Sequence, residues 1–209
     1  MPSIRAALFD FGGVISTSPF EGFNRYERDH GLPVDFLRGL NATNPDSNAW
    51  ARHERSELTF DEFCDAYEGE ARAAGHSIDA REVIGCLSGD LRPEMIEAIG
   101  RCHERLRTGL ITNNMAAMND QDNPPWLSAV HGLFDVVIES SREGIRKPDP
   151  RIYELACEQL GVEASEVVFL DDLGINLKPA AAMGMTTIKV VDADEALKEL
   201  EDVVGFAVR

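Results

Sequence analysis

The second half of this chain alternates short apolar runs with amphipathic helical segments, and this alternation constrains the fold most. The runs TGLITNN, FDVVIES, EVVFLDD and TTIKVV are rich in β-branched and other apolar residues. Strands that are apolar along their whole length are typical of a parallel sheet covered by helices on both faces. Helical spacing is found in residues 93–107, 149–161, 177–184 and 192–204. We therefore predict an α/β fold built on a doubly wound parallel sheet.

The N-terminal half begins with one more strand and then departs from the alternation. IRAALFD reads as a buried strand that ends at Asp10, and Gly12 and Gly13 follow it. Residues 17–88 contain helical stretches and no convincing buried strand. Open parallel sheets bind ligands outside the carboxyl ends of their strands, and a helical insertion there can exclude water from the site. We predict an α/β core of residues 1–16 and 89–209, with residues 17–88 forming a helical cap.

Charge and composition narrow the classes of partner. The chain has 209 residues and a formal net charge of -17, which disfavours nucleic acid and anionic membrane surfaces as partners. The apolar runs are too short to span a bilayer, and the first residues read as a strand rather than a signal peptide. The four cysteines form no CxxC pair, as is ordinary for reduced thiols. We expect a cytoplasmic monomer or homodimer that binds neither nucleic acid nor membrane.

Four polar groups follow the apolar runs, at the edge of the sheet where ligands bind. Asp10 ends the first strand, Thr112 the second, and Asp171 and Asp172 the strand EVVFLDD, while Lys147 stands in the segment RKPDP. Each alone has an ordinary explanation as a turn, a cap or a surface charge. Together they offer a carboxylate nucleophile, a hydroxyl, a cation and a site of hard oxygen ligands for Mg²⁺. A carboxylate can attack phosphorus to give an aspartyl-phosphate, so the set predicts a phosphoryl-transfer site.

The same segments resemble a known family. FDFGGV, LITNN, RKPDPRIY and FLDDLGINLKPA are similar, in order and spacing, to the four motifs of the haloacid dehalogenase (HAD) superfamily. The resemblance is closest to the phosphatase-like branch that includes the N-terminal domain of mammalian soluble epoxide hydrolases. It extends through WARHERSELTFDEF, LSGDLRPEM and TTIKV. It implies a HAD-like Rossmannoid core with a small helical cap, and a Mg²⁺-dependent phosphatase that acts on a small phosphorylated metabolite.

The resemblance also implies roles for the matching positions. Asp10 would be the nucleophile and a metal ligand, Thr112 would bind the phosphoryl oxygens, and Asn113 would help to orient them. Lys147 would bridge the nucleophile and the phosphoryl group, and Asp172 would be the principal remaining Mg²⁺ ligand. The supporting positions are Phe11 in the phosphate-binding turn, Gly12 as a ligand through its backbone carbonyl, Asp171 as a second ligand or one acting through water, and Asn176.

One position departs from the family's pattern. Most phosphatases of the superfamily carry a second aspartate two residues after the nucleophile, where this chain has Gly12. General acid–base catalysis contributes about 10²- to 10⁴-fold in rate, so hydrolysis should be slower or confined to good leaving groups. His53, Glu54 and Glu57 are candidate substitutes in the cap, although a solvated helix face is the ordinary explanation for such charges. Gly12 could instead serve the geometry of the turn.

Two other functions stay open at this stage. A catalytically weak binding or regulatory protein is compatible with Gly12, whereas a haloacid dehalogenase is disfavoured because those enzymes keep no acidic metal pair like Asp171 and Asp172. The polar segment 115–126 is a candidate substrate contact. The aromatic residues that either line the cleft or simply pack are Phe20, Phe23, Tyr26, Trp50 and Trp126.

Overall fold

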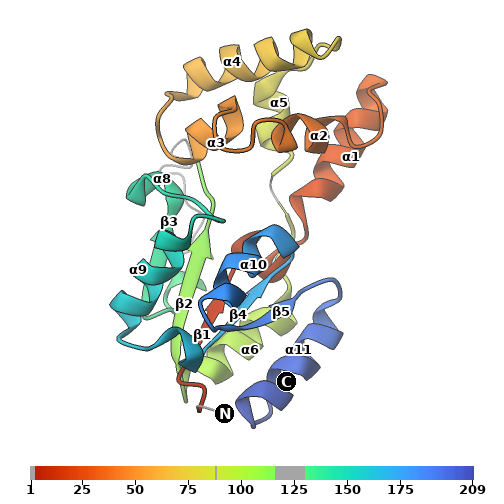
Figure 1. The fold of residues 1–209 in the computed structure, drawn as a ribbon. Helices are drawn as coiled ribbons and strands as arrows, with labels where there is room; N and C mark the ends of the chain where they lie inside the picture. The colour runs from red at the N-terminus through yellow and green to blue at the C-terminus, as the bar shows by residue number, and fades with distance from the viewer. Residues whose placement is uncertain (1–2, 88, 116–129) are drawn as a thin grey trace.

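The computed structural model describes residues 3–87, 89–115 and 130–209 (Figure 1). Its sheet has five parallel strands in the order β3-β2-β1-β4-β5. These strands are β1 (Ala6–Phe9), β2 (Arg107–Thr112), β3 (Val136–Glu139), β4 (Val167–Asp171) and β5 (Thr186–Lys189). The central strand β1 lies between β2 and β4, and the strand order reverses there. The doubly wound sheet is confirmed, and the reversal marks the edge at which open sheets bind ligands.

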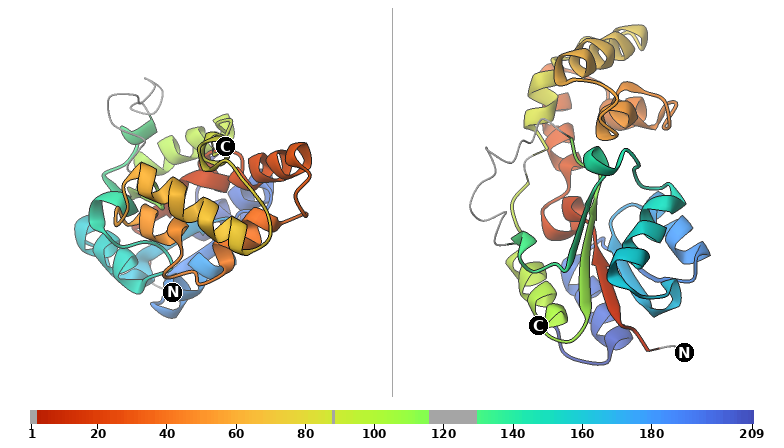
Figure 2. Two further views of the ribbon diagram at one scale, coloured as in Figure 1. Left: turned by 90° about the horizontal axis from the view of Figure 1, so that it is seen from above. Right: turned by 90° about the vertical axis from the view of Figure 1, so that its left-hand side faces the viewer.

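Helices cover both faces of this sheet (Figure 2). One face packs against α6 (Pro93–His103) and α11 (Ala193–Val204), and the other against α9 (Pro150–Leu160) and α10 (Gly174–Ala182). In β1, Ala7 and Phe9 belong to the first core, whereas Ala6 and Leu8 belong to the second. Because successive side chains of a strand point to opposite faces, a sheet buried on both sides needs apolar residues at every position.

A helical cap is inserted between β1 and α6 and stands above the carboxyl ends of the strands (Figure 1). It follows the π-helical turn η1 (Phe11–Ile15) and has its own apolar core around Trp50, Phe63 and Tyr67. Its helices are α1 (Pro19–His30), α2 (Phe36–Ala42), α3 (Ala49–Glu54), α4 (Phe60–Ala73) and α5 (Ala80–Gly85). The cap as such is therefore confirmed, while the division of the chain at 16/17 and 88/89 stays a prediction.

Two predicted helices have clearly different ends in the structure. The helix predicted over 93–107 ends at His103, and Arg107 already pairs with Ala6 in the sheet. The helix predicted over 177–184 spans Gly174–Ala182 and so begins three residues earlier. Strand β2 ends at Thr112, as predicted, and the side chain of the next residue, Asn113, donates to the Lys147 carbonyl.

The structure also describes the state of the cysteines and the length of the helices. Cys64, Cys86, Cys102 and Cys157 are all free thiols. Burial raises the pKa of Cys102 to about 12, which makes it a poor nucleophile. Across the ranges that the structure describes, no helix combines the length and the apolar character needed to cross a bilayer.

Candidate active site

Asp10 lies at the centre of the sheet edge, directly after β1. Its backbone N–H donates to the carbonyl of Leu170 at 2.9 Å, which ties the residue to β4. Its Oδ1 accepts from the backbone N–H of Phe11 at 2.7 Å and lies 2.7 Å from Lys147 Nζ. Burial raises the pKa of Asp10 to about 8, Lys147 opposes this rise, and the charges of Asp171 and Asp172 add to it. A buried carboxylate beside two others needs a cation to stay ionised.

Lys147 is the cation that the protein itself supplies. Its side chain is only 1% exposed, and Nζ lies 2.7 Å from Asp10 Oδ1 and 2.8 Å from Asp171 Oδ2. Burial opposes its charge, but the two carboxylates raise the pKa of Lys147 above its ordinary value. Asn113 holds the backbone on both sides, since its Oδ1 accepts from Lys147 N–H at 2.9 Å and its Nδ2 donates to the Lys147 carbonyl at 3.0 Å. The lysine is therefore fixed at both ends.

Asp171 and Asp172 are adjacent in sequence but have different surroundings. Asp171 is fully buried and accepts four hydrogen bonds, from Lys147 Nζ, from Leu173 N–H, and from Asn176 Nδ2 to each of its oxygens. These bonds use the acceptor capacity of a carboxylate. Asp172 is half-buried and accepts from Ser18 Oγ at 3.4 Å. Burial, together with the Asp171 charge, raises the pKa of Asp172 to about 6.

The three carboxylates form a cluster whose composition fits a hard divalent cation. Asp10, Asp171 and Asp172 each offer an oxygen within 4.8 Å of the others. Mg²⁺ prefers oxygen ligands, and since burial and the neighbouring carboxylates raise the pKa values of Asp10 and Asp172, a bound cation would favour their ionised forms. Asp10 and Asp172 retain acceptor capacity, whereas Asp171 is already committed to Lys147, Leu173 and Asn176.

The two glycines after Asp10 have different reasons to be there. Gly12 has an ordinary backbone conformation (φ -70°, ψ 128°), and a Cβ added to it would lie 3.5 Å from the ring of Pro19, a normal contact. Gly13 has a φ of +78°, and an added Cβ would overlap the carboxylate of Asp172. The turn geometry therefore requires glycine at position 13 and leaves room for a side chain at position 12.

The remaining predicted phosphate-binding positions lie on the same edge. Thr112 ends β2 and is half-buried, and Phe11 is half-buried with its carbonyl accepting from the N–H of Ser16 at 3.0 Å within the turn. Arg92 donates from Nη1 to the Gly13 carbonyl at 2.8 Å and so holds the same turn from α6's first residues. Arg92 and Ser18 were not singled out from the sequence, because neither ends a predicted strand, and Arg92 stood only as one residue of the stretch LSGDLRPEM.

The three cap residues considered as substitutes for a missing general acid lie in three different environments. His53 is 1% exposed, stacks on Phe63 and places Nδ1 3.1 Å from the Leu58 carbonyl, so it belongs to the cap core. Glu57 is half-exposed and pairs with Arg55 at the surface. Glu54 is the one of the three that reaches the α/β core, where Arg146 contacts it.

Most of the aromatic residues weighed as cleft residues are packing residues. Phe23, Tyr26 and Trp50 are buried in the cap core, and Phe23 and Trp50 meet edge to face with ring centroids 5.7 Å apart. Phe20 is half-buried, and the guanidinium of Arg38 lies 4.1 Å from its ring centroid. Trp126 and the rest of the polar segment 115–126 after Met115 lie outside the described residues, so its predicted substrate contact stays a prediction.

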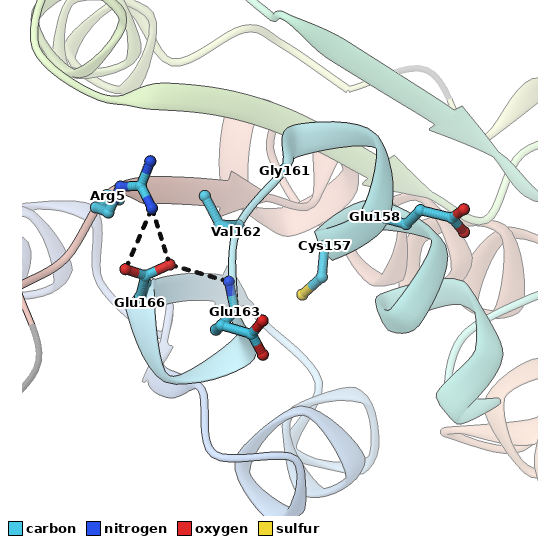
Figure 3. Close-up of a pocket in the computed structure, with 7 residues that line it drawn as sticks. All are labelled: Arg5, Cys157, Glu158, Gly161, Val162, Glu163 and Glu166. Atoms are coloured by element: carbon cyan, nitrogen blue, oxygen red, sulfur yellow. Dashed lines mark hydrogen bonds and ion pairs between the residues drawn. The ribbon is translucent and has the colours of Figure 1, made fainter.

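A surface hollow lies at the opposite edge of the sheet (Figure 3). It is lined by Arg5, Cys157, Glu158, Gly161, Val162, Glu163 and Glu166. Arg5 precedes β1 and Glu166 precedes β4, so this hollow is at the amino ends of the strands, away from Asp10. Arg5 and Glu166 already pair at 3.3 Å, and no nucleophile–base arrangement occurs among these seven residues.

Comparison with known proteins agrees with this geometry. The family model described as haloacid dehalogenase-like hydrolase matches residues 4–184. The chain belongs to this family. The HAD-like fold and the hydrolase class predicted from the sequence are thereby confirmed.

Some relatives of this HAD-like hydrolase are longer proteins that match it over only part of their length, and one relative has a similar length. It is 35% identical to acyl-CoA dehydrogenase family member 10 of Mus musculus over 98% of this chain and 19% of that protein. It is 32% identical to bifunctional epoxide hydrolase 2 of Mus musculus over 97% of this chain and 39% of that protein. The chain thus spans well under half of these two relatives. A sesquiterpene phosphatase of Aspergillus oryzae is 29% identical over 97% of this chain and 98% of its own length.

Solved structures share the fold at lower sequence identity. A predicted HAD-like family hydrolase from Porphyromonas gingivalis superposes with a TM-score of 0.73 at 20% identity, over 97% of this chain and 98% of that one. A HAD family enzyme from Bacteroides thetaiotaomicron, in complex with magnesium and inorganic phosphate, has a TM-score of 0.63 at 19% identity, over 90% and 94% of the two chains. These likenesses concern the arrangement of the sheet, its helices and the cap.

Proposed function

We propose that this HAD-like hydrolase is a Mg²⁺-dependent phosphatase for a small phosphorylated metabolite, with Asp10 as the nucleophile. The arrangement of Lys147 carries the proposal, because its buried ammonium lies 2.7 Å from Asp10 and 2.8 Å from Asp171. A fixed cation beside a nucleophilic carboxylate offsets the repulsion between that carboxylate and an approaching phosphate. The sesquiterpene phosphatase relative and the structural neighbour that holds magnesium and phosphate support the same reading.

Asp10 and Asp172 would hold the metal through their carboxylates, with the backbone carbonyl of Gly12 as a further oxygen. When bound, Mg²⁺ would neutralise charge on the carboxylates and on the phosphoryl oxygens. Asp171 would act mainly by holding Lys147, since Leu173 and Asn176 take up its remaining acceptor positions.

The proposed reaction has two displacements at phosphorus. A carboxylate oxygen of Asp10 forms a bond to phosphorus while the bond from phosphorus to the leaving oxygen breaks, and that oxygen leaves with the bonding electron pair as an anion that takes any proton it needs from water. Water then attacks the phosphorus of the aspartyl-phosphate, which releases inorganic phosphate and restores Asp10. Thr112 and Asn113 would orient the phosphoryl oxygens, and Lys147 would stabilise their charge through both steps.

Gly12 determines which substrates suit this site. No side chain at position 12 can protonate the leaving oxygen or activate water, which removes a contribution of about 10²- to 10⁴-fold. Phosphorylated compounds whose leaving groups need little protonation, such as acyl, aryl or sugar 1-phosphates, are therefore the favoured substrates. The same glycine favours the second candidate, a binding protein that turns over slowly.

The test is inorganic phosphate release from a panel of these esters and of alkyl phosphates, with Mg²⁺ and with EDTA, using Asp10→Asn as the blank. Mg²⁺-dependent release that disappears in the variant supports the phosphatase. Release that survives EDTA or the substitution contradicts it. Binding of Mg²⁺ and phosphate without release from any ester favours the binding protein, and metal-free chloride release from 2-chloropropionate favours a dehalogenase.

A further inference from the structure

One buried charge pair in this molecule has no role in the chemistry described above. Glu54, the last residue of the cap helix α3, has a side chain only 8% exposed, and its Oε2 lies 2.5 Å from Nε of Arg146, whose side chain is 20% exposed. Its other oxygen, Oε1, accepts from the Trp50 indole N–H at 2.9 Å. Removing two charges from water costs free energy, and this cost is offset only when the charges pair in good geometry.

Arg146 joins two segments of the cap to the core. Besides Glu54, its Nη1 donates at 2.9 Å to the carbonyl of Pro45, in the connection between α2 and α3. The end of α3 is held a second time, because Ser56 Oγ donates at 2.7 Å to the carbonyl of Ser141 in the core helix α8 (Ser140–Glu143). Figure 1 shows α3 directly above α8 at the carboxyl edge of the sheet.

The core end of this contact is one residue from the site. Arg146 directly precedes Lys147, whose backbone Asn113 holds on both sides and whose ammonium contacts Asp10. Burial raises the pKa of Glu54, and Arg146, Trp50 and Lys147 each oppose that rise. Glu54 therefore lies within the electrostatic reach of the catalytic lysine as well as of the arginine.

We propose that Glu54 and Arg146 form a cap–core clamp, a positioning pair that holds α3 down over the carboxyl edge and fixes the segment that carries Lys147. Neither residue touches the reacting atoms in this account. The clamp couples the position of the cap to the position of the lysine, so opening it loosens both. Its effect on turnover rests on the proposed phosphatase activity, whereas its existence as a structural contact does not.

The first readout is therefore independent of catalysis. Hydrogen–deuterium exchange of the full, metal-free chain would compare Glu54→Gln, Arg146→Met and the double variant with the unaltered protein. We expect backbone exchange in residues 45–56 and 140–147 to rise about tenfold in each single variant, between the effects of breaking an exposed and a fully buried pair. The double variant should exchange no faster than the worse single variant, because both substitutions remove one interaction.

Glu97→Gln is the matched control, since Glu97 pairs with Arg101 on the surface of α6, outside both segments. It should leave exchange in both segments unchanged. If Arg146→Met does not fold, Glu54→Gln decides alone, because it removes the charge and keeps the shape. Unchanged protection in Glu54→Gln would overturn the clamp.

The second readout separates positioning from chemistry. With Mg²⁺ and an aryl phosphate, the clamp variants should lose about tenfold in kcat/KM, in parallel with their loss of protection. A large loss of kcat in Glu54→Gln with unchanged protection would mean that Glu54 acts in the chemistry, which also overturns the proposal. If the unaltered chain releases no more phosphate than Asp10→Asn, the proposed function fails, and the exchange data still decide on the clamp.

Discussion

The two sides of Asp10 differ in whether polar side chains of the protein occupy them. On one side, Lys147, Asp171, Asn113 and Asn176 form a closed set in which each polar group already has protein partners. The other side is the turn at Gly12, where an added Cβ would make only an ordinary contact with the ring of Pro19. In the proposed phosphatase the first, closed side would bind the phosphoryl group, and the second, open side would meet the leaving group.

This difference indicates where selectivity resides. A preorganised cation stabilises the transferring group in the same way for every phosphate ester. In the proposed phosphatase the open side would discriminate between esters, because those with good leaving groups need no proton donor. The predictions below change one side or the other, from the largest expected effect to the smallest.

Lys147→Met removes the cation of the closed side and should have the largest effect. It leaves Asp10 and Asp171 facing each other without the ammonium that lies between them. We expect kcat/KM for an aryl phosphate to fall about 10³-fold, as when a preorganised donor is removed from an oxyanion site. Lys178→Met, at an exposed position of α10, should change nothing. Activity within a few-fold of the unaltered enzyme would show that the closed side is not where catalysis occurs.

Gly12→Asp fills the open side. The backbone at position 12 is ordinary, and a Cβ makes only a normal contact with Pro19, so the variant should fold. We expect hydrolysis of alkyl phosphates to rise about 10²-fold, because a carboxyl group there can protonate the leaving oxygen. Gly12→Asn, of nearly the same size, should give no such gain. Equal rates for Asp and Asn on alkyl phosphates would contradict the assignment of this side to the leaving group.

Gly13→Ala tests the turn between the two sides. Its φ of +78° and the overlap of a Cβ with Asp172 predict a loss of about 1–3 kcal/mol in the free energy of unfolding. Gly12→Ala is the matched control and should be neutral or stabilising by about 0.4–1 kcal/mol. Urea unfolding of both variants gives the comparison. Equal effects at the two positions would mean that the turn is not held as described.

Mg²⁺ should stabilise the chain modestly through Asp10 and Asp172. At ten times its dissociation constant, a ligand of the folded state adds about 1.4 kcal/mol. For a chain of this length that raises Tm by roughly 3–6 °C. Asp172→Asn should abolish the shift, while Asp149→Asn, at the half-exposed N-cap of α9, should keep it. An undiminished shift in Asp172→Asn would place the metal elsewhere.

The positions around Asp10 could be predicted from the sequence because parallel strands bring their carboxyl ends to one edge. Asp10, Thr112 and Asp171 each end an apolar run, so a strand reading alone placed them together. Lys147 ends no apolar run, and the sequence indicated it less directly, from its place in the segment RKPDP and in a family motif. Which glycine of the pair the turn requires could not be predicted, since the positive φ of Gly13 and its closeness to Asp172 are features of the folded chain.

The cap was harder to interpret. Its helices follow from local periodicity, but which helix face meets the core depends on tertiary packing that no local pattern records. The sequence therefore did not distinguish His53, Glu54 and Glu57. In the structure His53 is buried in the cap core, Glu54 contacts the α/β core, and Glu57 lies at the surface. Arg146 was missed for the same reason, because its partner is 92 positions away in the chain.

The central claim is that Asp10 carries the phosphoryl group between the two steps. The most direct measurement is mass spectrometry of the acid-quenched protein during turnover of an aryl phosphate with Mg²⁺. The account predicts a phosphoryl adduct on the peptide that contains Asp10, absent from Asp10→Asn and from samples treated with EDTA. Turnover without an adduct at Asp10, or an adduct on another residue, would contradict it.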